Sequence, residues 1–270
     1  MRRLQFLLLV AFAVIGFATM TSAADLPLKT PVVQLPPGTY DWTGFYIGGN
    51  LGGGWLSNRA TQTFDFVLAP VSGNTDGSGV LGGFQEGINW QFSRTWVVGI
   101  EADWSFTDAG RGFSRQGLTD LLGHTVPISS TNMSAKLDWL ASARNRLGYL
   151  VRPDLMVYGT GGVAWGKIGD QGATSINDAG FVYSSNVAST TIPAGWVAGG
   201  GLEWMLGSNW LLRGEYLFYH LNSQAISSTN LLSTGVICIP GPCAPQVGTT
   251  TYSLSNINVN VLRAALSYKF

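Results

Sequence analysis

Side chains able to act as general bases or nucleophiles are scarce in this sequence. The only two histidines are His124, in a polar segment, and His220, which is followed closely by Asn222 and Ser223. An enzyme acting on lipids would combine such a histidine with a serine or a carboxylate. No Gly-x-Ser-x-Gly motif is present, and a histidine in the setting of His220 is usually an interfacial polar residue. We therefore expect no catalytic residue, and a lipid-modifying enzyme is the least favoured alternative.

One glycine-rich segment imitates a nucleotide-binding motif. Gly159-Thr160-Gly161-Gly162-Val163-Ala164 has the spacing of a dinucleotide-binding fingerprint. That fingerprint works only where a helix follows and holds the pyrophosphate at its N-terminus. Trp165-Gly166-Lys167-Ile168-Gly169 follows here and is typical of a strand. Because the basic residues are scattered and metal ligands do not cluster, we expect no cofactor, no metal and no nucleic-acid partner.

The charged residues are few, but many alternate with apolar residues at a period of two. Only 11% of the residues are charged. Successive side chains of a strand point to opposite faces, so this spacing places the charges on one face. The residues assigned to that face are Glu101, Asp103, Asp138, Glu203, Glu215, Arg144, Arg146, Arg213, Arg263 and Lys269. The two signs balance, which predicts ion pairs, because buried charges are tolerated only when they are paired.

Composition indicates which kind of fold must position these charges. A charged fraction of 11%, with 36 glycines and 10 tryptophans, is typical of a membrane protein rather than a soluble domain. Beyond the N-terminus, however, no apolar run approaches the roughly 18 residues that a membrane helix needs. In lipid, only helices and closed barrels satisfy all backbone hydrogen bonds. The sequence therefore predicts a membrane β-barrel.

Short and long connections alternate along the chain. We predict strands at about 43–55, 80–92, 95–106, 134–149, 154–168, 194–206, 209–221 and 256–270. Short turns fall at 93–94, 151–153 and 207–208, and long polar loops at 56–79, 107–133, 169–193 and 222–255. This is the pattern of outer-membrane barrels. The predicted fold is all-β: an eight-stranded antiparallel up-and-down transmembrane β-barrel with four long external loops and three short periplasmic turns.

The tryptophans indicate which face of the barrel contacts lipid. Outer-membrane barrels carry aromatic girdles at both membrane interfaces. One set lies beside the predicted turns: Trp42, Trp90, Trp96, Trp204 and Trp210. The other set lies towards the predicted loops: Trp55, Trp104, Trp139, Trp165 and Trp196. We therefore expect the aromatic face to contact lipid and the charged face to fill the lumen; a soluble barrel with the opposite orientation is the alternative.

The N-terminus predicts export. Arg2 and Arg3 precede an apolar run, and small residues follow it, with signal-peptide cleavage expected after Ala23 or Ala24. The predicted parts are a signal peptide at 1–23, a Pro-rich periplasmic leader at 24–41 and the barrel at 42–270. Export places Cys238 and Cys243 in an oxidising compartment, where an isolated close pair predicts a disulfide at a loop tip.

The segment from Asp41 to Trp55, DWTGFYIGGNLGGGW, resembles the first strand of the alphaproteobacterial outer-membrane immunogenic protein family, which has a WTGFYxGxNxGxGW pattern. The resemblance continues through Arg144-Asn145-Arg146-Leu147-Gly148 to the closing Leu266-Ser267-Tyr268-Lys269-Phe270. It implies an OmpA-like barrel, antigenic loops and insertion by the barrel-assembly machinery, which recognises a C-terminal strand with aromatic residues such as Tyr268 and Phe270. Members of the family are often labelled porins.

We predict a surface antigen and structural barrel of the Gram-negative envelope. The charged residues plug the lumen, the tryptophan belts fix the depth in the membrane, and the loops carry antigenic or adhesive contacts. The expected partners are outer-membrane lipid and lipopolysaccharide, the barrel-assembly machinery during biogenesis, and host or surface ligands at the loops. The main alternative is a narrow porin for passive diffusion of small solutes, which would need gaps in the ionic plug.

Overall fold

The computed structural model describes residues 40–65, 68–178, 181–234 and 246–270. Its strands are β1 (Gly44–Phe64), β2 (Val71–Asn74), β3 (Gly77–Gln91), β4 (Trp96–Thr107), β5 (Gly110–Thr119), β6 (Thr125–Arg152), β7 (Leu155–Asp178), β8 (Phe181–Thr191), β9 (Ala194–Leu206), β10 (Trp210–Leu221), β11 (Gln224–Thr234) and β12 (Gln246–Lys269). Within these ranges, no helix is long and apolar enough to cross a membrane. The predicted signal peptide, nearly all of the predicted leader, and both cysteines lie outside the described residues.

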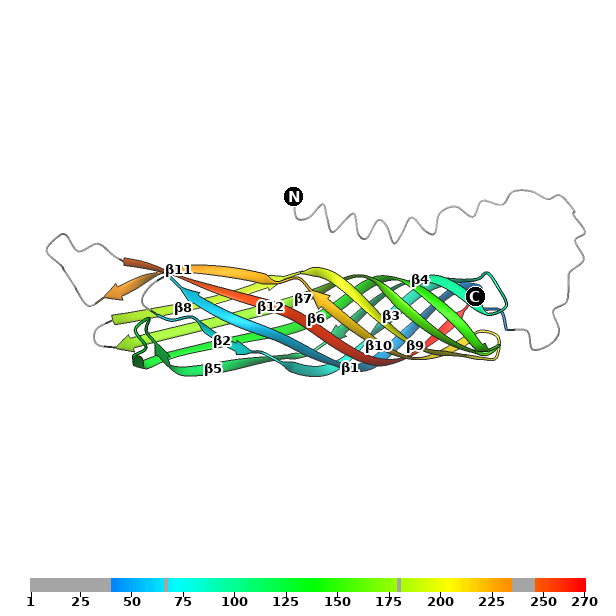
Figure 1. The fold of residues 1–270 in the computed structure, drawn as a ribbon, viewed down its shortest axis with the longest axis horizontal. Coiled ribbons are helices and arrows are strands. Elements are labelled where there is room, and N and C mark those ends of the chain that lie inside the picture. Colours follow the sequence, from blue (N-terminus) through cyan, green and yellow to red (C-terminus); the bar gives the residue numbers. More distant parts are fainter. Residues whose placement is uncertain (1–39, 66–67, 179–180, 235–245) are drawn as a thin grey trace, which may run out of the picture. The chain divides into compact units, whose positions relative to one another are not determined.

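Eight long strands close into an antiparallel ring (Figure 1). Its order is β1, β3, β4, β6, β7, β9, β10 and β12, and β12 pairs back with β1. Each of these strands covers one of the eight predicted segments to within a residue or two at the turn end. The predicted fold class is therefore confirmed, with tight turns joining β3 to β4, β6 to β7 and β9 to β10.

The pairing register shows how far the strands are staggered. A path that starts at Ile88 of β3 and crosses the ring from each residue to its partner returns to β3 at Ser78, ten residues from its start (88 − 78) and nearer the loop end. The residues on the path are Ile100, Asn145, Gly161, Ala198, Phe218, Asn260 and Trp55. Strands of staggered barrels tilt by about 35–45°, and eight of them leave just enough interior for side chains to fill.

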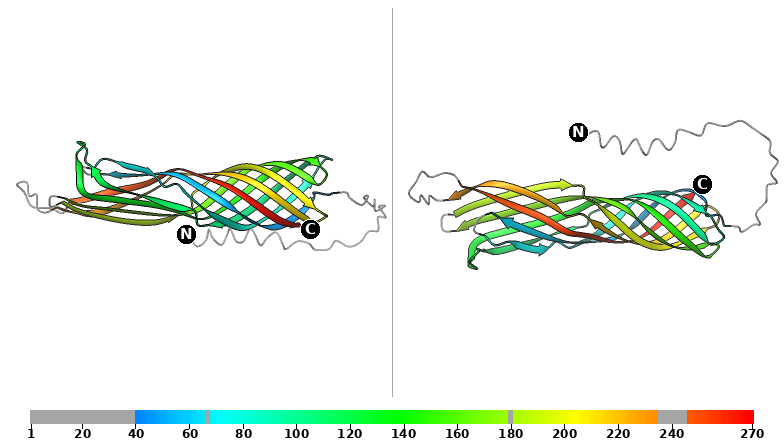
Figure 2. Two further views of the ribbon diagram at one scale, coloured as in Figure 1. Left: turned by 90° about the horizontal axis from the view of Figure 1, so that it is seen from below. Right: turned by 45° about the horizontal axis from the view of Figure 1, so that its top comes forward.

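The four segments predicted to be long loops are largely β-strand, which corrects the prediction. β1, β6, β7 and β12 continue beyond their predicted ends and pair with β2, β5, β8 and β11 (Figure 2). These strands form an upper tube beyond the main ring. These segments are predicted to be loops because they are rich in serine, threonine and asparagine, whose side chains usually compete with the strand ladder for backbone hydrogen bonds. Here their side chains satisfy one another inside the tube, as where Thr131 donates to Gln62 and Thr174 contacts the Tyr252 hydroxyl at 3.2 Å.

The lumen of the ring is filled by side chains in successive layers. At the turn end an apolar and aromatic cluster includes Trp42, Tyr46, Leu150, Met156 and Leu211. Charged residues occupy the next layer. Beyond them, on the loop side, a larger apolar cluster includes Leu56, Leu137, Ile168, Leu221 and Ile257. The charges are therefore enclosed between two apolar layers.

Trp42 is a correction to the predicted aromatic belts. It is fully buried rather than facing outwards. Its indole Nε1 donates to the carbonyl oxygen of Pro153 at 3.0 Å, and its backbone nitrogen donates to Gln91 Oε1 at 3.2 Å. Because Trp42 precedes β1, the alternation of the strand does not determine the direction of its side chain.

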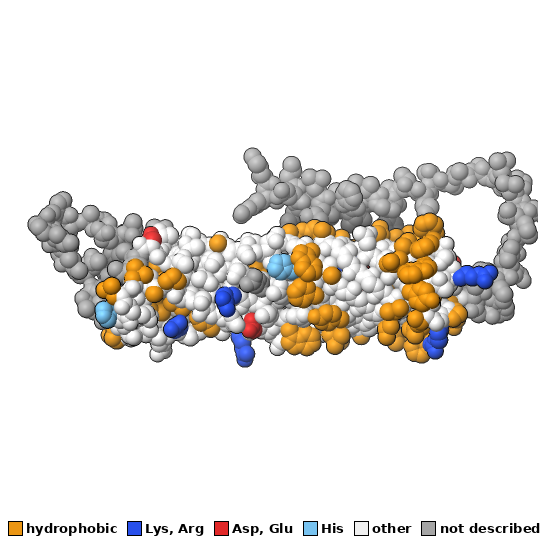
Figure 3. Space-filling model, in the orientation of Figure 1, with side chains coloured by type: hydrophobic (Ala, Val, Ile, Leu, Met, Phe, Trp, Pro, Cys, Tyr) orange, Lys and Arg blue, Asp and Glu red, His pale blue; other side chains and the backbone are white. Residues whose placement is uncertain are grey.

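The other nine tryptophans lie on or near the outer surface. Trp55, Trp90, Trp96, Trp165, Trp196, Trp204 and Trp210 are exposed. Trp104 and Trp139 are half-buried because their rings pack together, with centroids 4.5 Å apart. On the face drawn in Figure 3, two bands of hydrophobic side chains cross the ring, with a zone of other side chains and backbone between them. The outer surface thus has an aromatic band near each end of the ring.

Asp170 lies inside the upper tube without a partner for its charge among the residues that the structure describes. It is 7% exposed, and its ladder partners are Ala135 and Ser189. Neither carboxylate oxygen has a hydrogen-bond partner within the described residues. Burial raises the pKa of Asp170 from 3.8 to about 6.

Replacing Asp170 with Asn should stabilise the barrel at neutral pH. Burial favours the protonated carboxyl of Asp170. The free energy of unfolding of the wild-type barrel therefore falls as pH rises towards and through about 6, because the buried carboxylate must then ionise. The asparagine variant has no such loss. In urea unfolding of the refolded chain, the gain in Asp170→Asn over wild type should grow from near zero below about pH 4 to roughly 1–2 kcal/mol above about pH 7. Asp108→Asn removes the same charge from an exposed position and serves as the control. A gain that does not change with pH would contradict the assignment.

Candidate functional site

Eight charged side chains meet in the middle of the lumen. They come from five strands: Glu101 and Asp103 from β4, Arg144 and Arg146 from β6, Glu203 from β9, Arg213 and Glu215 from β10, and Arg263 from β12. All are buried, with exposures of 5% or less. Four carboxylates face four guanidinium groups, so the formal charge of this ionic layer is zero. The two-residue alternation places each of them inwards.

Arg144 joins three carboxylates in one half of the ionic layer. Its Nη1 lies 3.0 Å from Glu215 Oε1, its Nη2 lies 3.0 Å from Asp103 Oδ2, and Nη2 also pairs with Glu101. Arg263 links two of the same acids: its Nη1 lies 3.0 Å from Asp103 Oδ1 and its Nη2 2.8 Å from Glu215 Oε2. Each of these carboxylates therefore contacts more than one arginine.

The other half of the layer is organised around Glu101 and Glu203. Arg213 Nη1 lies 2.6 Å from Glu101 Oε2, and its Nη2 lies 3.3 Å from Glu203 Oε1. Arg146 pairs with both acids. Glu101 thus belongs to both halves, which makes the eight residues one connected network.

Two tyrosines complete the network, and sequence reasoning did not select them. The Tyr46 hydroxyl donates to Glu101 Oε2 at 2.5 Å, and the Tyr158 hydroxyl donates to Glu215 Oε1 at 2.7 Å. The Arg146 guanidinium carbon also lies 4.3 Å from the centre of the Tyr158 ring. The signal was available, because Tyr46 alternates with the outward-facing Phe45 and Ile47.

Glycines on neighbouring strands make room for the arginines. Gly162 is paired with Arg144, and a Cβ atom at Gly162 would lie 2.7 Å from the Arg144 Cα. Gly52 is paired with Arg263, and a Cβ atom there would lie 2.7 Å from the Arg263 Cα. Real Cβ atoms essentially never approach so closely. The ionic layer therefore requires the absence of a side chain at these glycines.

Two residues assigned to the lumen network lie elsewhere. A bulge between Leu137 and Trp139 shifts the alternation of β6, so Asp138 is half-exposed and pairs with Lys167 at 2.9 Å. Lys269 is buried but lies at the turn end, where it is paired with Tyr46 and its Nζ donates to the carbonyl oxygen of Thr43 at 3.2 Å. The first difference arises because a sequence pattern does not reveal a bulge.

In the ionic layer the carboxylates and the guanidinium groups neutralise one another. Every carboxylate is held by at least two arginines, so none is placed to exchange protons with a substrate. Among the described residues, no group of three or more histidine, cysteine, aspartate or glutamate side chains could hold a metal ion. The arrangement can hold the strands together and obstruct the lumen.

Replacing Arg144 with Met should destabilise the barrel by about 3–5 kcal/mol, because three buried carboxylates lose a shared partner. Urea unfolding in phospholipid vesicles, followed by tryptophan fluorescence, measures the loss. Arg152→Met is the matched control, since Arg152 is exposed at a turn and its ion pair with Asp154 should contribute under about 1 kcal/mol. Equal effects of the two substitutions would show that the layer does not stabilise the fold.

Comparisons with known proteins identify the family. A family model described as the outer membrane protein beta-barrel domain matches residues 9–270. The chain is 32% identical to the 31 kDa outer-membrane immunogenic protein of Brucella melitensis, over 94% of this chain and 95% of that protein. It is 28% identical to the 22 kDa outer membrane protein of Rhizobium leguminosarum, over 75% of this chain and 71% of that protein.

Among solved structures, the chain is similar to the outer membrane protease OmpT of Escherichia coli, with 9% identity, a TM-score of 0.41, and coverage of 86% of this chain and 98% of that one. A similarity of this size supports no argument about activity. The immunogenic relatives carry names that describe location and antigenicity rather than a reaction. With its eight-stranded antiparallel ring and a family model that matches most of its length, the chain belongs to the outer membrane protein beta-barrel family.

Proposed function

We propose that this outer-membrane barrel is closed to solutes and acts through its surface, as a structural component and a site of contact. The observation that carries the proposal is the ionic layer, which crosses the lumen between two apolar layers. A narrow porin would need a continuous polar path past residues such as Leu137 and Ile257, both fully buried in the upper apolar cluster. The closed barrel is therefore the better supported function.

The upper tube supports the second half of this proposal. Four hairpin extensions carry the chain well beyond the loop-side end of the eight-stranded ring (Figure 1). Many of their exposed residues are serine, threonine, asparagine and glycine, which offer hydrogen bonds, with charged residues such as Arg59 and Lys136 among them. We propose that this tube presents the antigenic and adhesive surface to host or surface ligands.

Basic residues beyond the upper aromatic band support contact with lipopolysaccharide. On β1, Arg59 lies four residues beyond Trp55, and on β6, Lys136 lies three residues beyond Trp139. Both side chains are exposed, and neither has an ion pair within the described part of the chain. Blue side chains lie on the loop side of the orange bands in Figure 3. Phosphates of the outer leaflet would meet these cations at that level.

The C-terminal strand supports recognition by the assembly machinery. Tyr268 and Phe270 face outwards and remain exposed, and Phe270 N donates to the carbonyl oxygen of Phe45 at 2.9 Å. The final aromatic residues are thus held at the seam where β12 closes against β1.

The refolded mature chain should pass no steady current in a planar bilayer, because the ionic and apolar layers block the lumen. Folding is checked by the heat-dependent shift of the band on a gel. If the wild-type chain does pass current, a variant with both Arg144 and Glu215 replaced by Ser tests the route. A changed conductance in this variant shows that the ions cross the lumen. Steady current in the wild-type chain that this substitution alters would establish a pore and refute the closed barrel.

The double substitution Arg59→Gln and Lys136→Gln should reduce the stabilisation that lipopolysaccharide provides. We expect the melting temperature of the wild-type barrel to rise when lipopolysaccharide is added to phospholipid vesicles, and to rise less in the variant. Arg94→Gln with Arg152→Gln makes the same charge change at the turn end and is the control. An equal rise in all three proteins would refute the proposed contact.

A further inference from the structure

Two polar side chains lie on the outer surface between the aromatic bands. Glu86 on β3 and Asn145 on β6 are both exposed, on the face that contacts lipid. Neither side chain makes a hydrogen bond or an ion pair with any residue that the structure describes. A carboxyl or carboxamide group in hydrocarbon is costly without a hydrogen-bond partner. Lipid tails supply none, so these two groups need a protein partner.

The register places Glu86 and Asn145 at the same depth. Glu86 is paired with Ala102 on β4, and Ala102 with Ala143 on β6; Asn145 lies two residues further along β6. Because the strands are tilted, the step from Glu86 across β4 to Ala143 on β6 shifts the position roughly 6 Å in depth towards the loop side. The step of two residues along β6 from Ala143 to Asn145 shifts it roughly 5 Å back towards the turn side. The displacements nearly cancel in depth, and they leave the two residues roughly 11 Å apart around the barrel.

The residues between them define a local axis. On β4, Ile100 is paired with Asn145 and Ala102 with Glu86, so the midpoint between Glu86 and Asn145 falls on β4 between Ile100 and Ala102. Rotation by 180° about an axis that runs along the membrane normal through that point keeps each residue at its depth and exchanges the β3 side of the face with the β6 side. In a dimer with this symmetry, Glu86 of each molecule therefore lies opposite Asn145 of the other. Such reciprocity is the mark of an isologous interface.

We propose that the face formed by β3, β4 and β6 binds a second copy of this chain within the membrane, with Glu86 of each copy hydrogen-bonded to Asn145 of the other. The Asn145 amide donates to a carboxyl oxygen of Glu86. An unrelated partner would not require complementary groups at equal depth on either side of one strand. The self-complementary spacing therefore favours an identical copy.

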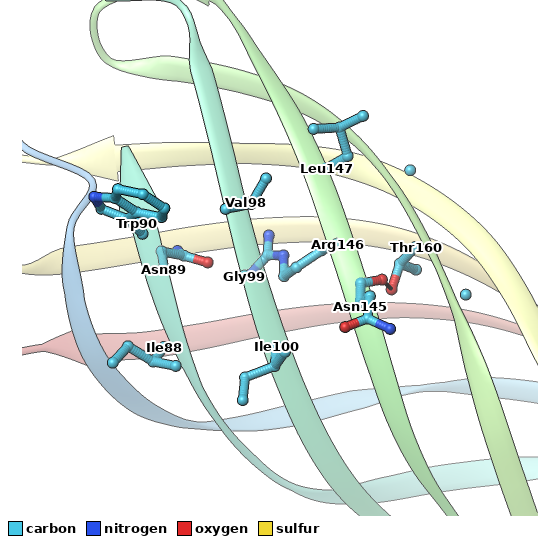
Figure 4. A pocket seen from close by; sticks show the side chains of 12 residues that line it. Ile88, Asn89, Trp90, Val98, Gly99, Ile100, Asn145, Arg146, Leu147 and Thr160 are labelled. Atoms are coloured by element: carbon cyan, nitrogen blue, oxygen red, sulfur yellow. Dashed lines mark hydrogen bonds between the residues drawn. The ribbon is translucent and has the colours of Figure 1, made fainter. Parts of the chain in front are cut away.

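The shape of this face suits close approach. Ala102 and Ala143 face outwards near the axis, and small residues let the backbones of membrane proteins come together. Beside Asn145 lies a groove of about 790 Å³, lined by Trp90, Val98, Ile100 and Leu147 with Gly159 and Gly161 (Figure 4).

Cysteine cross-linking in vesicles tests the proposal. The full mature chain, with Cys238 and Cys243 replaced by Ser, carries either Ala102→Cys at the axis or Ala264→Cys on β12. Ala264 is also outward-facing and small, but belongs to a different face of the ring. The Ala102→Cys chain should form disulfide-linked dimers at least about tenfold faster under the same oxidant, because the dimer holds the two thiols at high effective concentration.

Substitutions of the polar pair test the hydrogen bonds themselves. In the Ala102→Cys chain, Glu86→Leu or Asn145→Leu should lower the rate to that of the Ala264→Cys control, and the two together should lower it no further. Glu86→Gln keeps a hydrogen-bonding group and should retain most of the rate. Equal rates at the two cysteine positions in otherwise unaltered, folded barrels would overturn the interface, and a Glu86→Leu chain that still cross-links rapidly would overturn the role of the pair.

Discussion

The need to pair the eight charges buried in the middle of a narrow lumen determines much of this structure. Four arginines and four acids in an eight-stranded barrel have no access to water, and each must meet its partners through the lumen. This demand fixes the register, because a slip of one residue would turn the charges outwards. It also fixes small residues: Gly162 and Gly52 lie beside Arg144 and Arg263, where a Cβ atom would collide with the neighbouring backbone.

The same constraint separates the roles of the inside and the outside. Mutually bound charges and apolar side chains fill the lumen of the ring and tie its strands together. The outer surface also changes with depth. Aromatic bands set the position of the ring in the membrane. Beyond it, the upper tube extends backbone pairing into water and displays polar side chains.

Sequence reasoning succeeded where one local rule decides the outcome and failed where two segments interact. The alternation of apolar and charged residues is local, so eight of the ten charged positions assigned to the lumen lie in the ionic layer. Asp138 was misassigned because a bulge is a property of the β6–β7 pair rather than of either strand. Trp42 was misassigned because it packs under the turn at Pro153, more than a hundred residues away. The upper tube was missed because its polar strands are stabilised by contacts across the tube, such as Thr131 with Gln62.

The outward position of Glu86 follows from these interior requirements. Its neighbours Gln85 and Gly87 both face the lumen. Gln85 donates to the Ser267 hydroxyl at 3.0 Å, and Gly87 is paired with Glu101, where a Cβ atom would lie 2.6 Å from Tyr46 Cζ. Turning Glu86 inwards would therefore expel Gln85 and place a side chain against the tyrosine that binds Glu101. An apolar residue would satisfy the register equally well and would avoid the cost of a carboxyl group in lipid. The interior explains why position 86 faces outwards, but it gives no reason for a glutamate there; a partner in the membrane does.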